Sequence, residues 1–301
     1  MQQMDSQVFN NMFAQAINDP TLLAKAAATT GTWIRERVLE TSFLDEIITC
    51  NTITQNELDI SETDDEPKKL AFIEPGATAA TVNFRGDTST KWIEAEKVFI
   101  PFKKIQTTKY QKNEAELLGY RYPITQVFED KMVKAIAYQK DYSFITLTNE
   151  CITRMGSDSA ATVSADMNRD TIAAGLNLLA NYELNCGTIL MSLRDWNIWN
   201  TAKAEDVGND IANEMTSLGY QKKMITGTKA IVTNKKDYVA PGTLYFFAPA
   251  DYLGENYVLA DVKFEIKKDT DIISMVAWGY YGCAILNIRG AVKVTLPALS
   301  L

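Results

Sequence analysis

Histidine, the side chain used most often as a general base and as a zinc ligand, is absent from all 301 residues of the chain. A Ser–His pair is therefore impossible. The sequence also lacks the glycine-rich motifs of phosphate-binding loops and the Gly-x-Ser-x-Gly motif of a nucleophile elbow. We identify no catalytic and no cofactor-binding residues. These absences favour a protein that works through its surfaces, with a carboxylate- or cofactor-dependent cytosolic enzyme as the alternative.

Carboxylates gather in one short segment. Six acids occur within residues 57–66: Glu57, Asp59, Glu62, Asp64, Asp65 and Glu66. Their spacing does not match a calcium-binding loop, which also needs a glycine at its centre. We therefore interpret the segment as a solvated run of charge and predict no metal site.

The cysteines Cys50, Cys151, Cys186 and Cys283 are far apart in the sequence, with no CxxC pair. This spacing excludes a zinc knuckle and predicts buried, reduced thiols in a reducing compartment. The N-terminus does not resemble a signal peptide, and no apolar stretch is long enough to span a bilayer. We therefore expect a cytosolic origin and no membrane contact.

The composition is that of a folded chain, with 46% hydrophobic residues and a net charge of −8. An acidic surface repels phosphate, so we expect at most weak, non-specific contact with nucleic acid.

The first forty residues have a helical pattern. An apolar stripe runs along one predicted helix face and consists of Val8, Phe9, Met12, Phe13, Ala16 and Ile17. Asp19-Pro20 ends this helix. An amphipathic helix at this end of a chain can dock on its own domain or on a neighbour, and the sequence leaves both open.

An extended pattern follows, from residue 47 to about residue 112. Residues 47–54 are β-branched and predict a strand, and residues 92–103 alternate over a long stretch. Lysines dominate its second limb: Lys91, Lys97, Lys103, Lys104, Lys109 and Lys112. An arm of about twenty residues would reach ~65 Å, which predicts a projecting hairpin. The alternative is an ordinary hairpin that folds back on the core.

The remainder mixes helices and strands. Residues 124–154 carry the longest helical pattern, which corresponds to a rod of roughly 46 Å. Further helices are predicted at 170–182, from 192 through Trp196 and Trp199, and at 210–218. Strands are predicted at 187–192, 230–233, 243–247, 258–267, 272–277, 283–286 and 291–296. We assign the chain to the α+β class.

Two segments carry a family resemblance: DIISMVAWGYYGCAILNIRGAVKVTL at 271–296 and RDTIAAGLNLLANYELNCGTILMSLRDWNIW at 169–199. Together with the order of elements, they resemble major capsid proteins of tailed bacteriophages, whose fold is named after phage Hong Kong 97. The resemblance implies an N-terminal arm at 1–33 and an extended β-hairpin loop at 57–112. It implies a peripheral domain made of 34–56, 113–165 and 257–301, with the spine helix at 124–154. It implies an axial domain at 166–256.

The resemblance also implies a function. A non-enzymatic capsid protein would self-assemble into pentamers and hexamers of an icosahedral shell that encloses the viral genome. It would assemble in the host cytoplasm and reside in the virion. A nanocompartment shell of the same fold is an alternative. Many relatives begin with a scaffolding segment, whereas here the arm begins almost at Met1. A separate scaffolding protein, a portal and decoration proteins are therefore the expected partners, beside further copies of the chain.

The residues that we expect at inter-subunit contacts follow from charge and hydrophobicity. Acids of one copy would pair with lysines of the next, and the arm would contribute apolar side chains. They are Glu62, Asp64, Asp65, Glu66, Lys97, Lys103, Lys104, Phe9 and Phe13.

Overall fold

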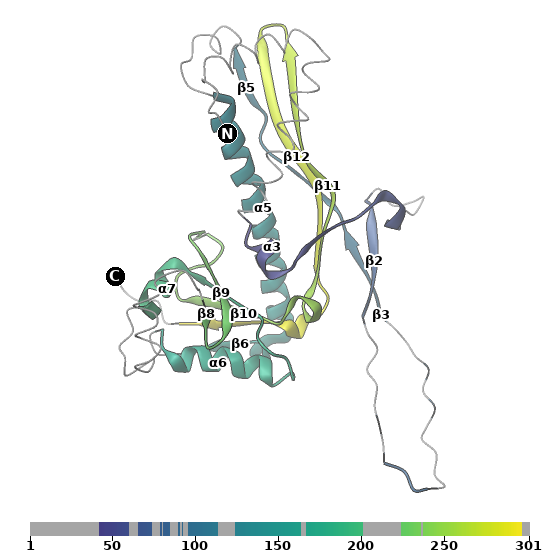
Figure 1. Cartoon of the computed structure of the whole chain (residues 1–301), viewed down its shortest axis with the longest axis vertical. Coiled ribbons are helices and arrows are strands. Elements are labelled where there is room, and N and C mark those ends of the chain that lie inside the picture. The colour runs from purple at the N-terminus through teal and green to yellow at the C-terminus, as the bar shows by residue number, and fades with distance from the viewer. Residues whose placement is uncertain are drawn as a thin grey trace.

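The computed structural model describes residues 42–59, 66–73, 79, 81–84, 90, 92, 96–113, 124–163, 167–200, 224–235 and 237–296. These residues form two main sheets, a long helix and a projecting two-stranded ribbon (Figure 1). The helices are α3 Leu44–Ile47, η1 Gln55–Glu57, α5 Ile124–Met155, η2 Gly156–Asp158, α6 Arg169–Ala180, α7 Leu193–Asn200, η4 Ala250–Tyr252 and η5 Ile288–Gly290. The strands are β1 Cys50–Thr52, β2 Lys68–Ile73, β3 Glu96–Pro101, β4 Lys103–Gln106, β5 Tyr110–Asn113, β6 Ala160–Thr162, β7 Thr188–Ser192, β8 Met224–Ile225, β9 Thr228–Thr233, β10 Thr243–Phe247, β11 Gly254–Asp269, β12 Ile272–Ile285 and β13 Ala291–Thr295. The predicted mixture of helix and sheet is confirmed.

A long hairpin of β11 and β12 forms the centre of the first sheet. Strand β1 joins β11 in parallel, while β4 and β5 pair antiparallel with β12. The sequence predicts two strands where the structure has the single strand β12. The chain stays extended at Gly282, where an added Cβ would lie 3.0 Å from the Phe102 ring. The absence of a side chain at Gly282 therefore lets the strand lie against this ring.

Helix α5 is confirmed within a residue of its predicted bounds, and it connects two hydrophobic cores. Met132 and Ile136 in its first half pack on the β11–β12 sheet. Phe144, Ile145 and Ile152 in its second half pack in a different core, built on the six-stranded sheet. One continuous helix therefore carries both sheets, as Figure 1 shows.

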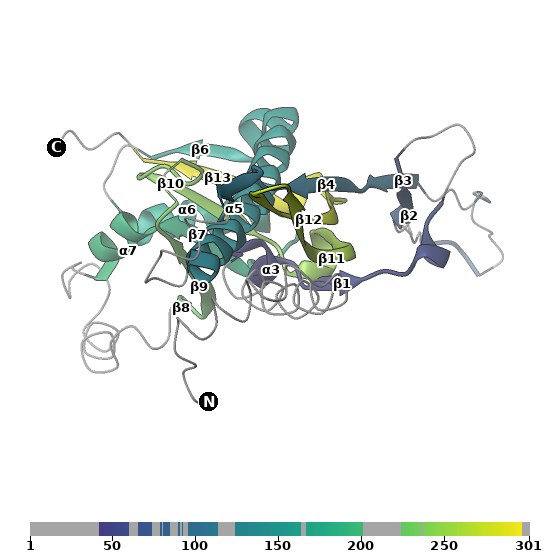
Figure 2. The same cartoon turned by 90° about the horizontal axis from the view of Figure 1, so that it is seen from above.

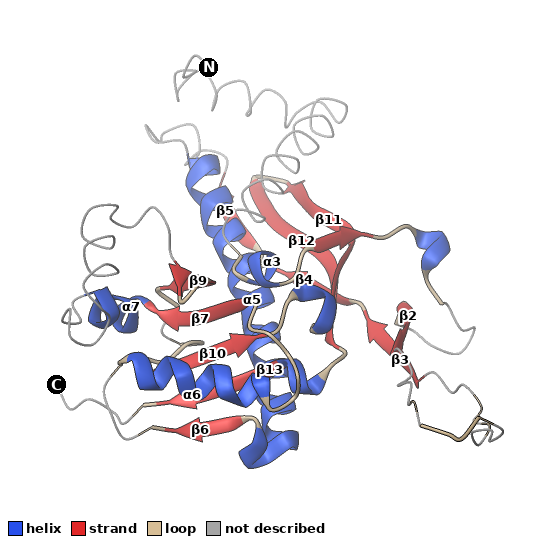
Figure 3. Cartoon of the chain, turned by 60° about the horizontal axis from the view of Figure 1, so that its bottom comes forward, coloured by secondary structure: helices blue, strands red, loops and turns tan. Residues whose placement is uncertain are grey.

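The second sheet has six described strands in the order β6-β13-β10-β7-β9-β8. Every residue of β7 and β10 is buried, because α6 and α7 pack on one face and α5 on the other (Figure 3). Gly175 of α6 lies so close to Phe246 that no side chain would fit there. Strands β6 and β13 belong to the segments 113–165 and 257–301, which the resemblance assigns to the peripheral domain. The other four strands belong to the segment 166–256, which it assigns to the axial domain, so this one sheet combines strands of both segments.

The ribbon of β2 and β3 stands apart from both sheets. The two strands pair antiparallel, with Ile73 opposite Glu96 and Lys68 opposite Pro101. Seen from above, the ribbon extends to one side of the molecule (Figure 2). Strands β4 and β5 follow it in sequence but join β12, so only part of the segment 57–112 projects.

One strand prediction is wrong at its start. The strand is predicted at 47–54, but Ile47 is the last residue of the helical turn α3, and β1 spans only Cys50–Thr52. Leu44 and Ile47 are spaced three apart, and the turn buries both side chains in the core beside α5. Burial of this pair overrides the β-branched composition. The predicted helix at 210–218 and the apolar stripe at 8–17 lie outside the described residues.

Candidate functional site

The root of the ribbon is anchored to the body. Ala71 and Ile100 point inward and are buried with Phe102 and Tyr257 in a small core. The Lys69 ammonium lies 4.0 Å from the centre of the Tyr257 ring. Because the root is packed in this way, the direction in which the ribbon leaves the body is fixed.

The opposite face of the ribbon is apolar and uncovered. Leu70 and Phe99 pair across the strands, and Phe72 lies two residues from Leu70 on the same face. Phe72 and Phe99 are 59% and 51% exposed. Farther along the projection, Phe84 is 111% exposed and Trp92 is 92% exposed. Aromatic side chains bury on the order of 150–250 Å² each when covered, so this surface fits a partner.

The predicted contact residues are distributed over two elements. Glu66 and Lys97 lie exposed on the ribbon, where Lys97 pairs with Phe72. Lys103 and Lys104 lie exposed on β4, opposite two tyrosines of β12. The acids Glu62, Asp64 and Asp65 and the apolar residues Phe9 and Phe13 lie outside the described residues.

Lys104 has a partner that sequence reasoning missed. Its ammonium lies 4.8 Å from the centre of the Trp278 ring, and the Lys263 ammonium lies 5.2 Å from the same ring. Both ammonium groups therefore contact the Trp278 ring, which lies on the face of the first sheet that α5 does not cover. The sequence predicts a strand at 272–277, directly before Trp278, but no pattern in the sequence indicates which lysines contact this ring.

A buried polar network joins the two sheets to α5. Asp141 is fully buried, accepts hydrogen bonds from Ser42 Oγ (2.8 Å) and the Leu44 N–H (3.2 Å), and pairs with the Lys235 ammonium. Burial raises the pKa of the Asp141 carboxyl, although the Lys235 ammonium opposes this shift. The next residue, Lys140, binds both carboxylate oxygens of Asp45 at 3.0 Å.

This network fixes four elements at one point. Asn256 of β11 donates to Asp45 Oδ1 at 2.9 Å, which adds the first sheet to the joint. Lys235 follows β9 of the second sheet, and Ser42 precedes α3. The arrangement positions these elements, and Lys140 and Asn256 also line a cleft of about 500 Å³ between α5 and β12.

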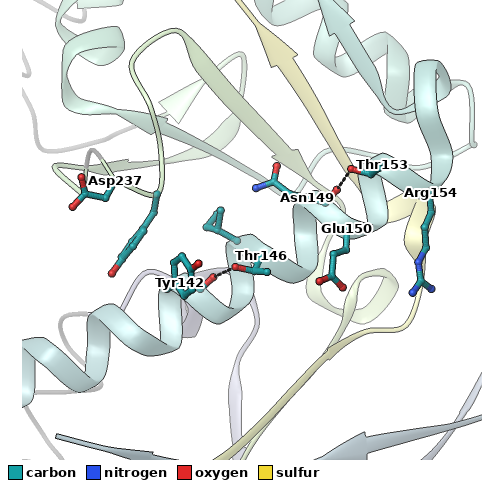
Figure 4. Close-up of a pocket in the computed structure, with 9 residues that line it drawn as sticks. Tyr142, Thr146, Asn149, Glu150, Thr153, Arg154 and Asp237 are labelled. Atoms are coloured by element: carbon teal, nitrogen blue, oxygen red, sulfur yellow. Dashed lines mark hydrogen bonds between the residues drawn. The ribbon is translucent and has the colours of Figure 1, made fainter. Parts of the chain in front are cut away.

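Open clefts flank α5 and the ribbon. One groove of about 560 Å³ follows α5 and is lined by Tyr142, Thr146, Asn149, Glu150, Thr153, Arg154 and Asp237, among others (Figure 4). The hydroxyls of Thr146 and Thr153 donate to backbone carbonyls four residues earlier in the helix. Ser143 and Thr148 do the same. These four hydroxyls therefore donate to the backbone of their own helix.

Chemically reactive groups are sparse elsewhere too. Within the described residues, no cluster of three or more His, Cys, Asp or Glu side chains is placed to hold a metal ion. All four cysteines are free, but each is half-buried where the sequence predicts a buried thiol. Burial raises the pKa of Cys186 and of Cys283 to about 12, which makes both thiols poor nucleophiles near neutral pH. None of the described helices is long and apolar enough to cross a bilayer.

The fold of this chain is similar to that of several solved protein structures. A chain of the cyanophage P-SCSP1u capsid matches with a TM-score of 0.59 and 12% identity, over 85% of this chain and 88% of its own length. A chain of Microbacterium phage Oxtober96 matches with a TM-score of 0.61 and 10% identity, over 85% and 91% of the two chains. A chain of the bacteriophage PhiM1 mature capsid matches with a TM-score of 0.55 and 7% identity, over 83% and 86%.

The protein has the fold of phage capsid proteins. The likeness spans 85% of this chain in both of the first two matches, so it covers most of the fold. Sequence comparison adds nothing to this, because neither the protein-family models nor the curated proteins gave a match.

Proposed function

We propose that the protein is a major capsid protein of a tailed bacteriophage. Copies assemble into pentamers and hexamers of an icosahedral shell of the Hong Kong 97 type, which encloses the viral genome. The exposed aromatic side chains of the ribbon and of the segment that connects its strands are the observation that carries this proposal, because Phe72, Phe84, Trp92 and Phe99 are left in water in a single copy. The capsid-protein fold supports it.

The elements take the following roles in this proposal. Helix α5 is the spine helix, the ribbon is the body of the extended loop, and the six-stranded sheet with α6 and α7 is the core of the axial domain. Residues 1–33 form the arm. A separate scaffolding protein, a portal and decoration proteins are the further partners, assembly takes place in the host cytoplasm, and the protein carries out no enzymatic reaction.

Assembly from many modest contacts allows errors to dissociate before the shell closes. Acids of the segment 57–66 pair with Lys97, Lys103 and Lys104 of a neighbouring copy in this proposal and set its register. The lysines lie exposed on β3 and β4, which is compatible with such pairing.

Neutralising Lys103 and Lys104 together tests this pairing. With both changed to glutamine, we expect shell yield to fall while the thermal midpoint of the monomer changes little, because both side chains are exposed. A charge-matched control changes Lys131 and Lys134, which are exposed on α5, to glutamine. Shell yield is measured by sedimentation. Normal shells from the Lys103/Lys104 variant would rule out the pairing.

Electron microscopy of the purified protein tests the function itself. Closed shells, pentamers or hexamers are the expected result. Small uniform particles at every concentration, with or without a scaffolding protein, would contradict the proposal.

A further inference from the structure

The cleft between α5 and β12 is lined mainly by apolar side chains. Helix α5 runs alongside the β11–β12 hairpin, and the cleft of about 500 Å³ opens between them (Figure 1). Its apolar walls include Phe99, Ile105, Leu147, Tyr281 and Ile285. Clefts of this volume and character are the usual sites of small-molecule ligands, and a few polar groups in them set the orientation of the ligand.

Two polar side chains lie at the buried end of this cleft. Lys140 and Asn256 line it and are only 2% and 1% exposed. The Lys140 ammonium and the Asn256 Nδ2 group both donate to Asp45 Oδ1, at 3.0 Å and 2.9 Å. Asn256 Nδ2 also donates to the carbonyl of Ile48 at 3.4 Å. Because both partners of Nδ2 are acceptors, the orientation of the amide is fixed and Oδ1 points away from them.

Asn256 Oδ1 is buried and has no hydrogen-bond partner within the described residues. An acceptor buried without a partner is unfavourable, and native proteins rarely leave one in this state. The groove in Figure 4 differs in this respect, because its amide oxygen, Asn149 Oδ1, accepts from the Tyr245 hydroxyl at 3.2 Å. The cleft between α5 and β12 therefore combines apolar walls with an acceptor that lacks a donor.

We infer that this cleft binds a small uncharged molecule with an apolar body and one hydroxyl group, which donates its hydrogen to Asn256 Oδ1. The apolar body contacts Leu147 of α5 and Tyr281 of β12. A cationic donor is disfavoured because the Lys140 ammonium lies beside the site, and an anion is disfavoured because it has no hydrogen to donate. Binding involves a single chain, so it goes beyond the proposed function and does not depend on it.

A matched pair of probes tests the hydrogen bond. The phenol p-cresol has an aromatic body and one hydroxyl group, whereas its methyl ether has the same body and no donor. In calorimetric titrations of the unassembled wild-type protein at neutral pH, we expect p-cresol to bind about tenfold more tightly or better, because only its hydroxyl satisfies Asn256 Oδ1. Equal affinities, or no binding of either probe, would overturn the inference.

Filling the cleft tests the location of the ligand. Leu147→Trp enlarges a half-buried side chain in the cleft, and we expect it to weaken the binding of p-cresol by about tenfold or more. The matched control is Thr153→Trp, an exposed position of the same helix that lines the groove in Figure 4, and it should leave the affinity unchanged. Circular dichroism checks that both variants fold. Undiminished binding to Leu147→Trp would show that the ligand lies elsewhere.

Replacing the acceptor provides a third test. In Asn256→Leu, we expect p-cresol and its methyl ether to bind equally well, because the oxygen that distinguishes them is absent. A preference for p-cresol that persists would assign the hydrogen bond to another group and contradict the inference. If the loss of the bonds to Asp45 and Ile48 prevents this variant from folding, the probe pair and Leu147→Trp decide. None of these measurements involves shells, so their failure would leave the proposed function standing.

Discussion

At the residue scale, the joint at Asp141 is the most constrained polar feature of the described structure. A buried ion pair is weak evidence for stability, because desolvation of both charges offsets their attraction. Its hydrogen bonds to Ser42 and the Leu44 N–H point to a different role. The pair fixes where the chain enters the body and how the turn after β9 lies on α5. The ion pair of Asp141 and Lys235 positions these elements and adds little to the free energy of unfolding.

The raised pKa of Asp141 predicts the direction in which the free energy of unfolding changes with pH. The folded protein holds the proton of this carboxyl more tightly than the unfolded chain, whose value is about 3.8. Its contribution to the free energy of unfolding is therefore fully present below that pH and is lost as pH rises through the folded-state pKa. With Asp141→Asn, which cannot titrate, we expect the stability of the wild type relative to the variant to fall as pH rises above about 3.8.

Urea unfolding at several pH values measures this difference. Asp251→Asn is the matched control, because Asp251 is exposed. A relative stability that grows with pH would show that the Lys235 ammonium outweighs burial and would contradict the assignment.

At the scale of elements, α5 shows what periodicity can predict. Its apolar positions, among them Met132, Ile136 and Ile152, recur at helical spacing and all three are buried. The sequence could not show that they belong to two cores, because spacing along a helix identifies a face and not the surface that it meets. The strands β4 and β5 illustrate the same limit. The extended pattern over 47–112 includes most of both strands, but their pairing with β12 joins residues more than 150 positions apart.

Other features left no trace in the sequence. The pair of Asp141 and Lys235 joins residues 94 positions apart, and its members resemble ordinary surface charges in the sequence. A cleft of about 920 Å³ at the root of the ribbon is lined by residues of β1, β2, β3, β11, η4 and η5, which only the fold brings together. By contrast, the sequence predicts that a hairpin projects from the body, because strands longer than the core that supports them extend beyond it.

Helix α5 gives a prediction on stability. Phe144 is fully buried, and its ring centre lies 5.4 Å from that of Phe247 in β10. We expect Phe144→Ala to cost about 3–5 kcal/mol through lost burial and the cavity that remains. Gln139→Ala, at an exposed position on the same helix, is expected to change stability by less than about 0.5 kcal/mol. Chemical denaturation of the unassembled protein measures both, and equal effects would show that the core around α5 is misassigned.

At the scale of the whole molecule, the body and the projection have separate tasks. The two sheets and α5 bury their own cores, whereas the outer face of the ribbon buries little within one chain. Folding and assembly should therefore be separable by mutation.

Shortening the projection tests this separation. Ile73 lies directly opposite Glu96, so residues 74–95 can be replaced by Asn-Gly, which favours a tight two-residue hairpin turn. We expect the shortened protein to unfold with an unchanged midpoint and to form no shells, as judged by calorimetry and electron microscopy. The matched control replaces the same segment with a flexible polar linker of equal length. Shells from either chain would mean that the projection is dispensable.

The hydroxyl contacts along α5 have a mechanical consequence. Ser143, Thr146, Thr148 and Thr153 share carbonyls with the helix backbone, and such sharing loosens a helix and often bends it. The first of these bonds, from Ser143 to the carbonyl of Gln139, spans the interval between the two cores. Lys140 and Asp141 lie within this same interval and are bonded to Asp45 and Lys235, so a change in curvature there strains the buried ion pairs before it disturbs either hydrophobic core. The polar joint thus braces the rod where its own backbone bonding is loosened.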